Sequence, residues 1–285
     1  MKTLGVIGGS GLYDMPGLTD LEHLALRTPF GEPSDEFVCG RLGDVRLVFL
    51  PRHGRGHRWL PTEINYRANL FGMKQLGVEW LVSVAAVGSL RQEIEPGHLV
   101  VPDQFIDRTV ARPSTFFGGG IVAHVSMADP VCPGLSKLTL EAARAAGGTV
   151  HEGGTYVCME GPQFSTRAES ELYRAWGASL IGMTNWQEAK LAREAEICFA
   201  TLAIASDYDC WNTAARDVTI DEIIRLLQEN ADLARRCVAL VAQGLPDRRQ
   251  CACGNALKDA IVTDRERIPA GLRSDLSVLI GKYLS

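Results

Sequence analysis

The chain has 285 residues, of which 46% are hydrophobic and 22% charged, a composition typical of globular proteins and unlike that of disordered chains. Its 29 Lys and Arg residues against 34 Asp and Glu residues leave a net charge of −5, which argues against a nucleic-acid-binding protein because such proteins carry basic surfaces. The most apolar stretches, residues 80–90 and 197–206, are shorter than the roughly 20 residues that span a bilayer, so no membrane helix is expected.

Apolar, β-branched runs that predict strands alternate along the chain with helical patterns. The predicted strands are residues 4–8, 46–50, 80–86, 98–101, 155–159, 180–183 and 198–205. Thr166 and Glu169 form a capping-box pattern that predicts a helix over residues 166–176. A second pattern of this kind begins the longest helix at residue 219, and Gly244 ends it.

This alternation predicts an α/β fold with a substantially parallel sheet. The sequence contains neither an internal repeat nor a linker rich in Pro, Gly or Ser, so we expect one domain over residues 1–245. Residues 246–285 are less periodic, and we expect them to pack as an extension on the same domain or on a neighbouring subunit.

Loops that follow three of the strands are rich in groups that bind anions, at the sheet edge where open α/β sheets bind ligands. The glycines around Ser10 let backbone N–H groups approach an anion, although a plain tight turn explains them equally well. Arg52 and His53 suit a phosphate, and a solvated basic loop is the alternative. The small side chains of Ala85 and Ala86 either expose backbone N–H groups to a ligand or allow close packing.

Three further loops carry residues suited to an organic ligand. Phe164 could stack on a flat heterocycle or belong to the core. Met183 and Thr184 offer a thioether and a hydroxyl, although Met183 is equally typical of a core. Asp207 and Asp209 follow the most apolar strand, where burial would raise a carboxyl pKa and let the group donate a proton; capping of the next segment is the alternative.

The eight cysteines are scattered through apolar sequence, which is typical of a cytosolic enzyme with buried thiols. The start of the chain turns glycine-rich before a secretory segment could form, so we expect a cytoplasmic protein. Cys251 and Cys253 are either free thiols near a surface turn or partners in a disulfide, within or across chains. Two cysteines are too few for a closed zinc site, which needs four ligands, so we expect no metal.

Together, seven motifs resemble the methylthioadenosine phosphorylases, the adenine-specific branch of the trimeric purine nucleoside phosphorylases. The likeness runs from about residue 3 to about residue 245. The motifs are residues 8–12, 52–55, 87–90, 103–109, 160–165, 182–184 and 207–211. The resemblance implies a single-domain fold with a twisted, mixed but mostly parallel sheet, a partly closed barrel, flanked by helices.

The resemblance also implies a reaction, in which inorganic phosphate attacks C1′ of 5′-methylthioadenosine, adenine leaves and 5-methylthioribose 1-phosphate remains. Phosphate is the co-substrate, and no cofactor is expected. The phosphate-binding residues that the family implies are Ser10, Arg52, His53, Ala85, Ala86 and Thr184. The nucleoside-binding residues that it implies are Phe164, Ile181, Met183, Asp207, Asp209, Ile223 and His124. His124 would come from a neighbouring subunit, so a homo-oligomer is expected, either a trimer or a dimer of trimers.

By the same resemblance, Asp207 and Asp209 are the catalytic pair. Asp207 would donate to N7 of the leaving purine, and Asp209 would help to accept from the 6-amino group. The branches that act on 6-oxopurines carry Asn in this region, so two aspartates indicate adenine. The alternatives are a 6-oxopurine phosphorylase acting on 5′-methylthioinosine, inosine or guanosine, and a nucleotide-binding module in which Arg52 and Asp207 would have no role.

The chain departs from the family pattern at three places. Ala85 stands where many members carry Ser or Thr, and losing one hydroxyl donor should weaken phosphate binding by about 0.5–1.5 kcal/mol. Residues 185–188 replace a stretch that usually ends in Pro-Glu, so we expect a less rigid loop after Thr184. Cys251 and Cys253 resemble a C-terminal pair that forms a disulfide in some members, which favours the disulfide here.

Overall fold

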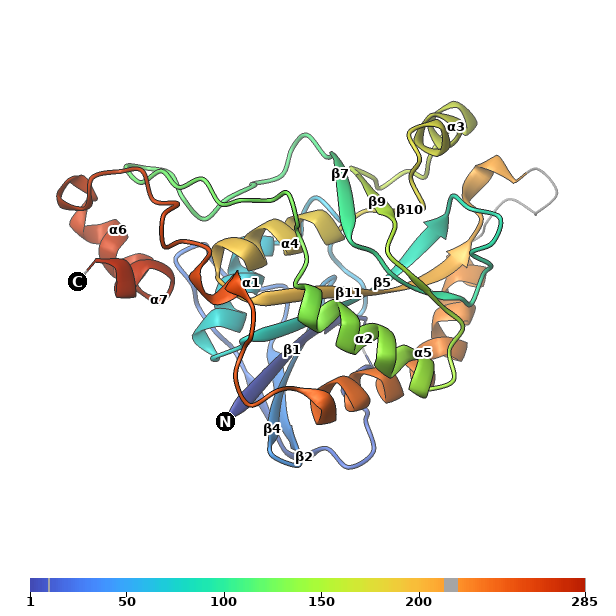
Figure 1. The fold of residues 1–285 in the computed structure, drawn as a ribbon, viewed down its shortest axis with the longest axis horizontal. Coiled ribbons are helices and arrows are strands. Elements are labelled where there is room, and N and C mark those ends of the chain that lie inside the picture. Colours follow the sequence, from blue (N-terminus) through green and yellow to red (C-terminus); the bar gives the residue numbers. More distant parts are fainter. Residues whose placement is uncertain (10, 213–219, 285) are drawn as a thin grey trace.

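A mixed β-sheet with helices on both faces forms the framework (Figure 1). The computed structural model describes residues 1–9, 11–212 and 220–284, and only the backbone of residues 220–229. The strands are β1 (Lys2–Gly8), β2 (Thr19–Leu24), β3 (Phe37–Leu42), β4 (Val45–Pro51), β5 (Trp80–Ser89), β6 (Leu99–Val101), β7 (Gln104–Arg108), β8 (Val150–Glu152), β9 (Thr155–Met159), β10 (Leu180–Gly182) and β11 (Cys198–Asp207). The α-helices are α1 (Tyr66–Gln75), α2 (Pro133–Ala145), α3 (Arg167–Ala175), α4 (Asn185–Glu194), α5 (Ile220–Gly244), α6 (Ala270–Asp275) and α7 (Ser277–Ile280).

Strand β5 is where the sheet divides. One edge of β5 pairs along its length with the parallel strand β11, which continues the sheet to β6 and β8. The other edge pairs first with the parallel strand β1, over residues 80–83, and then with the antiparallel strand β10, at Gly88 and Ser89. Because β1 and β10 run towards each other, both end beside residues 84–87 of β5. We call this opening in the β5 edge the central gap.

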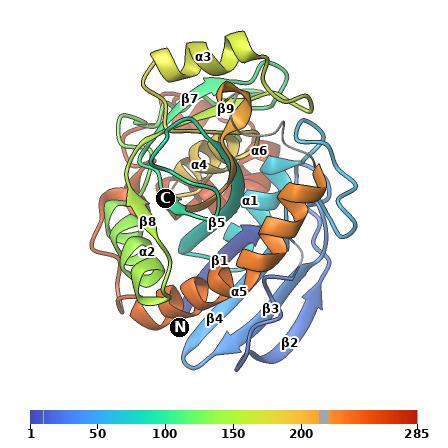
Figure 2. The ribbon, with the colours of Figure 1, turned by 90° about the vertical axis from the view of Figure 1, so that its right-hand side faces the viewer.

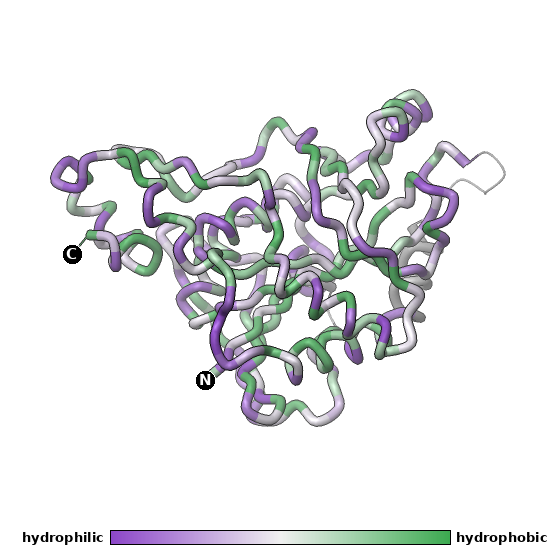
Figure 3. Tube along the Cα trace, in the orientation of Figure 1, coloured by the Kyte–Doolittle hydropathy of each residue, from purple (hydrophilic) through white to green (hydrophobic). Residues whose placement is uncertain are grey.

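Alternating side chains of the central strands pack against helices on the two faces. Leu4 and Val6 of β1 face a cluster that contains Leu135 of α2 and Val238 of α5. Ile7 faces the opposite cluster, which contains residues of α1, α4 and α7. Figure 2 shows α5 crossing one face of β1 and β4, and Figure 3 shows long hydrophobic stretches of the trace in the middle of the molecule. None of the described helices is long and apolar enough to cross a membrane.

The C-terminal extension packs on the body of the same chain. Leu257, Ile268 and Leu279 are buried in the same cluster as Phe71 of α1 and Phe199 of β11. Together with the segment before α2, part of the extension forms the projection that carries α6 in Figure 1. The extension therefore buries apolar side chains against its own chain.

All seven predicted strands are present, and α3 begins with the predicted capping box at Thr166 and Glu169. Helix α5 ends at Gly244 as predicted, while the cap predicted at residue 219 lies outside the described residues. The sheet is mixed and has helices on both faces, as predicted, but it is not strictly closed. The sequence did not predict β2, β3, β7 or β8; β2 is a polar, mostly exposed edge strand, and β8 has only three residues.

The position of Gly182 depends on the absence of a side chain. A Cβ atom there would lie 1.9 Å from the hydroxyl oxygen of Tyr156, whose ring is fully buried. We expect Gly182→Ala to lower the free energy of unfolding by about 1–3 kcal/mol through overpacking, as measured by urea denaturation. Gly134→Ala is the control, because a Cβ at Gly134 in α2 has no atom within 4 Å. Equal unfolding midpoints for the two variants would mean that the packing around Gly182 accommodates a side chain.

Candidate active site

The central gap is lined by backbone and by the loops after β4 and β10. The carbonyl oxygen of Val84 faces the gap, where it accepts a hydrogen bond of 2.7 Å from Arg52. Backbone groups of alternate residues in a strand face the same edge, so the N–H group of Ala86 also faces the gap. The carbonyl of Val87 points to the other edge, where it accepts from Ser206. The gap therefore presents a backbone donor where two strands end.

A buried polar network closes the floor of the gap. Arg52 is 5% exposed and Glu188 is 1% exposed, and their side chains form a bidentate ion pair at 2.7 and 3.1 Å. Arg52 also donates to the carbonyls of Ile7 and Val84 and to the hydroxyl of Ser83. Ser83 in turn donates to Glu188 at 2.5 Å. The guanidinium of Arg52 is thus committed to partners inside the protein and does not project into the gap as a free cation.

Helix α4 starts at the gap, directly after β10. Thr184 is the N-cap residue, and its side chain makes no capping hydrogen bond. Asn185 is buried, donates to Ser83 at 2.8 Å and accepts from Thr201 at 2.6 Å. The prediction of a less rigid loop over residues 185–188 is wrong, because these residues form the first turn of α4 and are fixed by buried hydrogen bonds. A helix N-terminus offers unpaired N–H groups and a positive dipole end, which together favour an anion.

His53 lies at the rim of the gap as a neutral imidazole. Its Nδ1 is 2.8 Å from the carbonyl oxygen of Trp59, and its ring stacks on His57 with centroids 4.1 Å apart. Burial lowers the pKa of His53 to about 4, so the ring is uncharged at neutral pH. A carbonyl can only accept, so Nδ1 carries the proton and Nε2 has a free lone pair. This nitrogen can accept a hydrogen bond from a protonated phosphate oxygen.

Asp207 and Asp209 lie beside Gly88, two residues along β5 from Ala86. A Cβ at Gly88 would be 3.2 Å from Oδ1 of Asp207 and 3.4 Å from Cβ of Asp209, and at 2.9 Å from Cγ2 of Ile181 it would force a neighbour to shift. Asp207 accepts hydrogen bonds from Ser206 at 2.5 Å and from the Asp209 amide at 2.7 Å. Burial raises the pKa of both carboxyl groups. A carboxyl in this setting holds a proton more readily than one in water.

The predicted nucleoside residues do not all meet in one chain. Ile181 packs against Gly88 but is a core residue, and the sulfur of Met183 lies against Gly161. Phe164 is 53% exposed. His124 is exposed on a segment that pairs with the C-terminal extension, on the projection that points away from the end of β11 (Figure 1).

Other predicted residues can be placed only in part. Ser10 and the side chain of Ile223 lie outside the described residues. Ala85 is buried in β5. Cys251 and Cys253 lie in the extension as free thiols, so the structure does not contain the disulfide that the resemblance favours.

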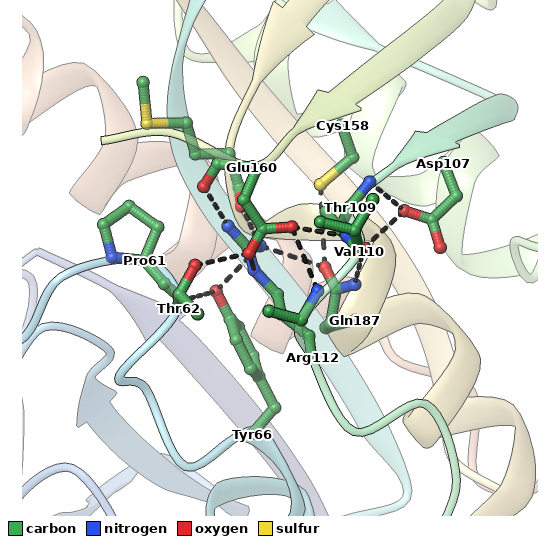
Figure 4. Close-up of polar contacts among 12 residues, drawn as sticks. Pro61, Thr62, Tyr66, Asp107, Thr109, Val110, Arg112, Cys158, Glu160 and Gln187 are labelled. Atoms are coloured by element: carbon green, nitrogen blue, oxygen red, sulfur yellow. Dashed lines mark hydrogen bonds and ion pairs between the residues drawn. The ribbon is translucent and has the colours of Figure 1, made fainter. Parts of the chain in front are cut away.

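Arg112 is the centre of a second network, which the sequence did not reveal (Figure 4). It donates to the carbonyls of Met183 and Glu160 and to the side chain of Gln187, and its Nε lies 3.4 Å from the Glu160 carboxylate. Glu160 also accepts from Thr62 at 2.6 Å. Arg112 thereby ties together the loops after β9 and β10. Nothing in the local sequence distinguishes Arg112, because its partners come from distant loops.

Comparisons with known proteins agree with one another. The model of the phosphorylase superfamily matches residues 3–243. An S-methyl-5′-thioadenosine phosphorylase of Geobacter sulfurreducens is 58% identical over 284 residues, with 99% of each chain covered. One from Koribacter versatilis is 55% identical over 280 residues, with 98% of this chain and 96% of the relative covered.

Solved structures give the same result. A methylthioadenosine phosphorylase from an antarctic soil metagenomic library superposes with a TM-score of 0.93 at 48% identity and covers 98% of both chains. The methylthioadenosine phosphorylase of Schistosoma mansoni in complex with adenine superposes with a TM-score of 0.85 at 33% identity, covering 91% of this chain and 99% of its own. The similarity therefore spans the sheet, the gap and the extension.

The buried ion pair should be costly to break from one side. Glu188→Gln leaves the Arg52 charge without its counterion, and we expect the free energy of unfolding to fall by about 3–5 kcal/mol in urea denaturation. Glu171→Gln is the control. Glu171 is exposed, and its ion pair with Arg174, at 3.7 Å, contributes less than about 1 kcal/mol to stability. If both variants lose a similar free energy of unfolding, the buried charge of Arg52 does not need Glu188 as its counterion.

Proposed function

Because this chain belongs to the phosphorylase superfamily, and within it to the S-methyl-5′-thioadenosine phosphorylases, we infer that its reaction is phosphorolysis of 5′-methylthioadenosine. The products are adenine and 5-methylthioribose 1-phosphate. The observation that carries this inference is the pair of half-buried carboxyl groups at Gly88, two residues along β5 from the central gap. The carboxyl groups can donate a proton to the leaving base, and the gap can hold the attacking phosphate.

Phosphate binds in the central gap in this proposal. The Ala86 N–H group, the Thr184 hydroxyl and the first turn of α4 donate to its oxygens, and Nε2 of neutral His53 accepts from its proton. Arg52 contributes positive charge from beneath; a direct contact would require its guanidinium to exchange one of its interior partners. Ala85 carries no hydroxyl at a position where many members have one, and its backbone lies in register with Ala203 of β11. Ser10 is proposed from the family motif alone.

The chemistry needs no nucleophile from the protein. As the glycosidic bond lengthens, the ribose gains oxocarbenium character, and the phosphate anion both stabilises that charge and attacks C1′, as a carboxylate does in retaining glycosidases. The electron pair of the broken bond moves to the purine, and Asp207 donates a proton or a strong hydrogen bond to N7. Asp209 assists by accepting from the 6-amino group. We propose that no cofactor takes part.

Adenine fits this carboxyl pair better than a 6-oxopurine. Adenine presents an acceptor at N7 and a donor at the 6-amino group, which match one protonated and one accepting carboxyl oxygen. Hypoxanthine and guanine present two acceptors, and the second would face a carboxylate oxygen that cannot donate. A 6-oxopurine phosphorylase therefore remains the alternative with the poorer hydrogen-bond match.

The active form proposed here is a homo-oligomer, a trimer or a dimer of trimers, in the cytoplasm. Phe164 is exposed in the loop after β9, and His124 is exposed on the segment that pairs with the C-terminal extension. A neighbouring subunit that covers Phe164 and inserts its own His124 beside the 5′ substituent of the nucleoside would explain why both residues are exposed in a single chain. The proposed partners are thus a nucleoside, phosphate and further copies of the chain, without nucleic acid or membrane.

Base release tests the proposed reaction. Ultraviolet absorbance should show fast release of adenine from 5′-methylthioadenosine only when phosphate is present. Adenosine, 5′-methylthioinosine and inosine are measured in parallel, each with and without phosphate. Preference for the inosine compounds would favour the 6-oxopurine alternative, and no release from any of the four would exclude phosphorolysis of these nucleosides.

Replacing one carboxyl group with an amide should change base preference. Asp207→Asn supplies a permanent donor, and we expect at least a tenfold shift in the ratio of kcat/KM values from 5′-methylthioadenosine towards 5′-methylthioinosine. The wild-type rate should fall as the pH rises through the raised pKa of Asp207, because the group then loses the proton that it donates. The variant should not show this fall, because an amide does not titrate. Asp275→Asn, an exposed change in α6, is the control. Unaltered adenine preference would rule out this role for Asp207.

Mixed oligomers test the contribution of the neighbour. His124→Ala should raise KM for 5′-methylthioadenosine, and Asp207→Ala should abolish turnover. Chains of the two variants, co-expressed with different tags and purified as mixed oligomers, should contain sites that combine a native Asp207 with a native His124 from the adjacent chain. We expect such oligomers to show the wild-type KM. A KM that stays raised would mean that His124 acts within its own chain or not at all.

A further inference from the structure

Four cysteines that are far apart in the sequence lie together at the end of β11 opposite the active site. The sulfur atoms of Cys132, Cys198, Cys251 and Cys253 all lie within 4.8 Å of one another. Cys132, Cys198 and Cys253 are buried, and Cys251 is half-buried. The sulfurs of Cys198 and Cys251 are 3.3 Å apart. We call these four residues the cysteine cluster.

Two members of the cluster are held in place by backbone hydrogen bonds to neighbouring segments. The Cys132 amide donates to the Phe199 carbonyl at 2.8 Å, and the Cys198 amide donates to the Glu79 carbonyl at 2.9 Å. These bonds fix two sulfurs to the sheet. The other two come from the extension, where Cys251 and Cys253 flank the first residue of a short turn, Ala252–Asn255. The cluster therefore joins the extension to the start of α2 and of β11.

We propose that the cysteine cluster binds a single zinc ion with four thiolate ligands. Zinc bound by four thiolates at about 2.3 Å places the sulfurs about 3.8 Å apart at the corners of a tetrahedron. Four sulfurs within 4.8 Å need only small side-chain shifts to reach that geometry. An iron–sulfur cluster would need the thiolates spread around several iron atoms, and a disulfide would need two sulfurs at about 2.05 Å. Cys251 and Cys253 alone are too few ligands for a zinc site, and the fold brings Cys132 and Cys198 beside them.

The surroundings suit a thiolate-bound cation. Cys132 is the N-cap residue of the 13-residue helix α2, whose positive dipole end favours a thiolate. Zinc binding displaces four thiol protons and leaves a site with a net charge of −2. A cavity of about 570 Å³ is lined by Cys132, Cys251 and Cys253 together with Arg193 and Arg249. This cavity gives the ion a path from solvent, and Arg193 in its lining adds a positive charge near the site.

A structural function follows from the position of the cluster. Zinc there would clamp the extension onto the body of the chain, close to Arg249, which already bonds the Glu196 carbonyl and the Glu79 carboxylate. Asp207 lies at the other end of β11, so the ion takes no part in phosphorolysis. The proposal is independent of the proposed reaction, and either can fail without the other.

Metal content tests the proposal directly. The full-length chain, purified under reducing conditions, stripped with a chelator and then exposed to zinc, should retain about one zinc per chain by elemental analysis after desalting. Cobalt in place of zinc should give one equivalent with the intense sulfur-to-cobalt charge-transfer absorption of a tetrahedral thiolate site. Removal of the zinc should lower the melting temperature and expose residues 246–250 to protease.

Variants separate the cluster from the other thiols. The double change Cys251→Ser and Cys253→Ser should abolish the cobalt absorption, whereas Cys39→Ala and Cys237→Ala, both buried outside the cluster, should keep it. The wild-type cobalt spectrum remains decisive if the double variant does not fold. Wild-type protein that binds less than a tenth of an equivalent would overturn the proposal. Titration that finds disulfides within the cluster of the native protein, or a double variant that binds cobalt like wild type, would overturn it equally.

Discussion

The ion pair between Arg52 and Glu188 is the constraint on which the site depends. It joins the loop after β4 to helix α4 beneath the central gap, and Ser83 of β5 bonds both side chains. Burying two charges is unfavourable unless almost every donor and acceptor is satisfied, so this arrangement tolerates very little displacement. Asn185 extends the same network to β11 through Thr201. The start of α4 is consequently fixed against the strand that carries Ala86.

In the proposed site, strand β5 lies between the two halves of the chemistry, with the central gap on its β1 and β10 edge and Asp207 on its β11 edge. Ala86 faces the proposed phosphate, and Gly88 supports the two aspartates, which puts the two half-sites roughly 6.6 Å apart along β5. That spacing leaves room for a ribose between phosphate and base. The Arg112 network fixes the loops after β9 and β10 that would cover the ribose. In the proposed reaction, attack and departure on opposite sides of C1′ correspond to these two positions along β5.

The sequence predicted what depends on local pattern. Seven strands were predicted because they are largely apolar runs, whereas β3, which is also mostly buried, was missed. A site was predicted in the loops after the strands because ligands bind where parallel strands end at a common edge. Partners brought in from distant segments could not be predicted. Glu188 looked like part of a loop, Arg112 had no local signal, and Cys251 and Cys253 seemed too few for a metal because Cys132 and Cys198 lie more than fifty residues away in the sequence. Tertiary structure alone makes these groups neighbours.

The most direct test of the proposed division of the site is a crystal structure of the protein with phosphate and an unreactive analogue of 5′-methylthioadenosine bound together. We expect a phosphate oxygen within hydrogen-bond distance of the Ala86 amide and the Thr184 hydroxyl. We also expect the Asp207 carboxyl within about 3 Å of the base nitrogen at position 7. Phosphate bound elsewhere, or a purine that does not touch Asp207, would contradict the assignment of the two half-sites.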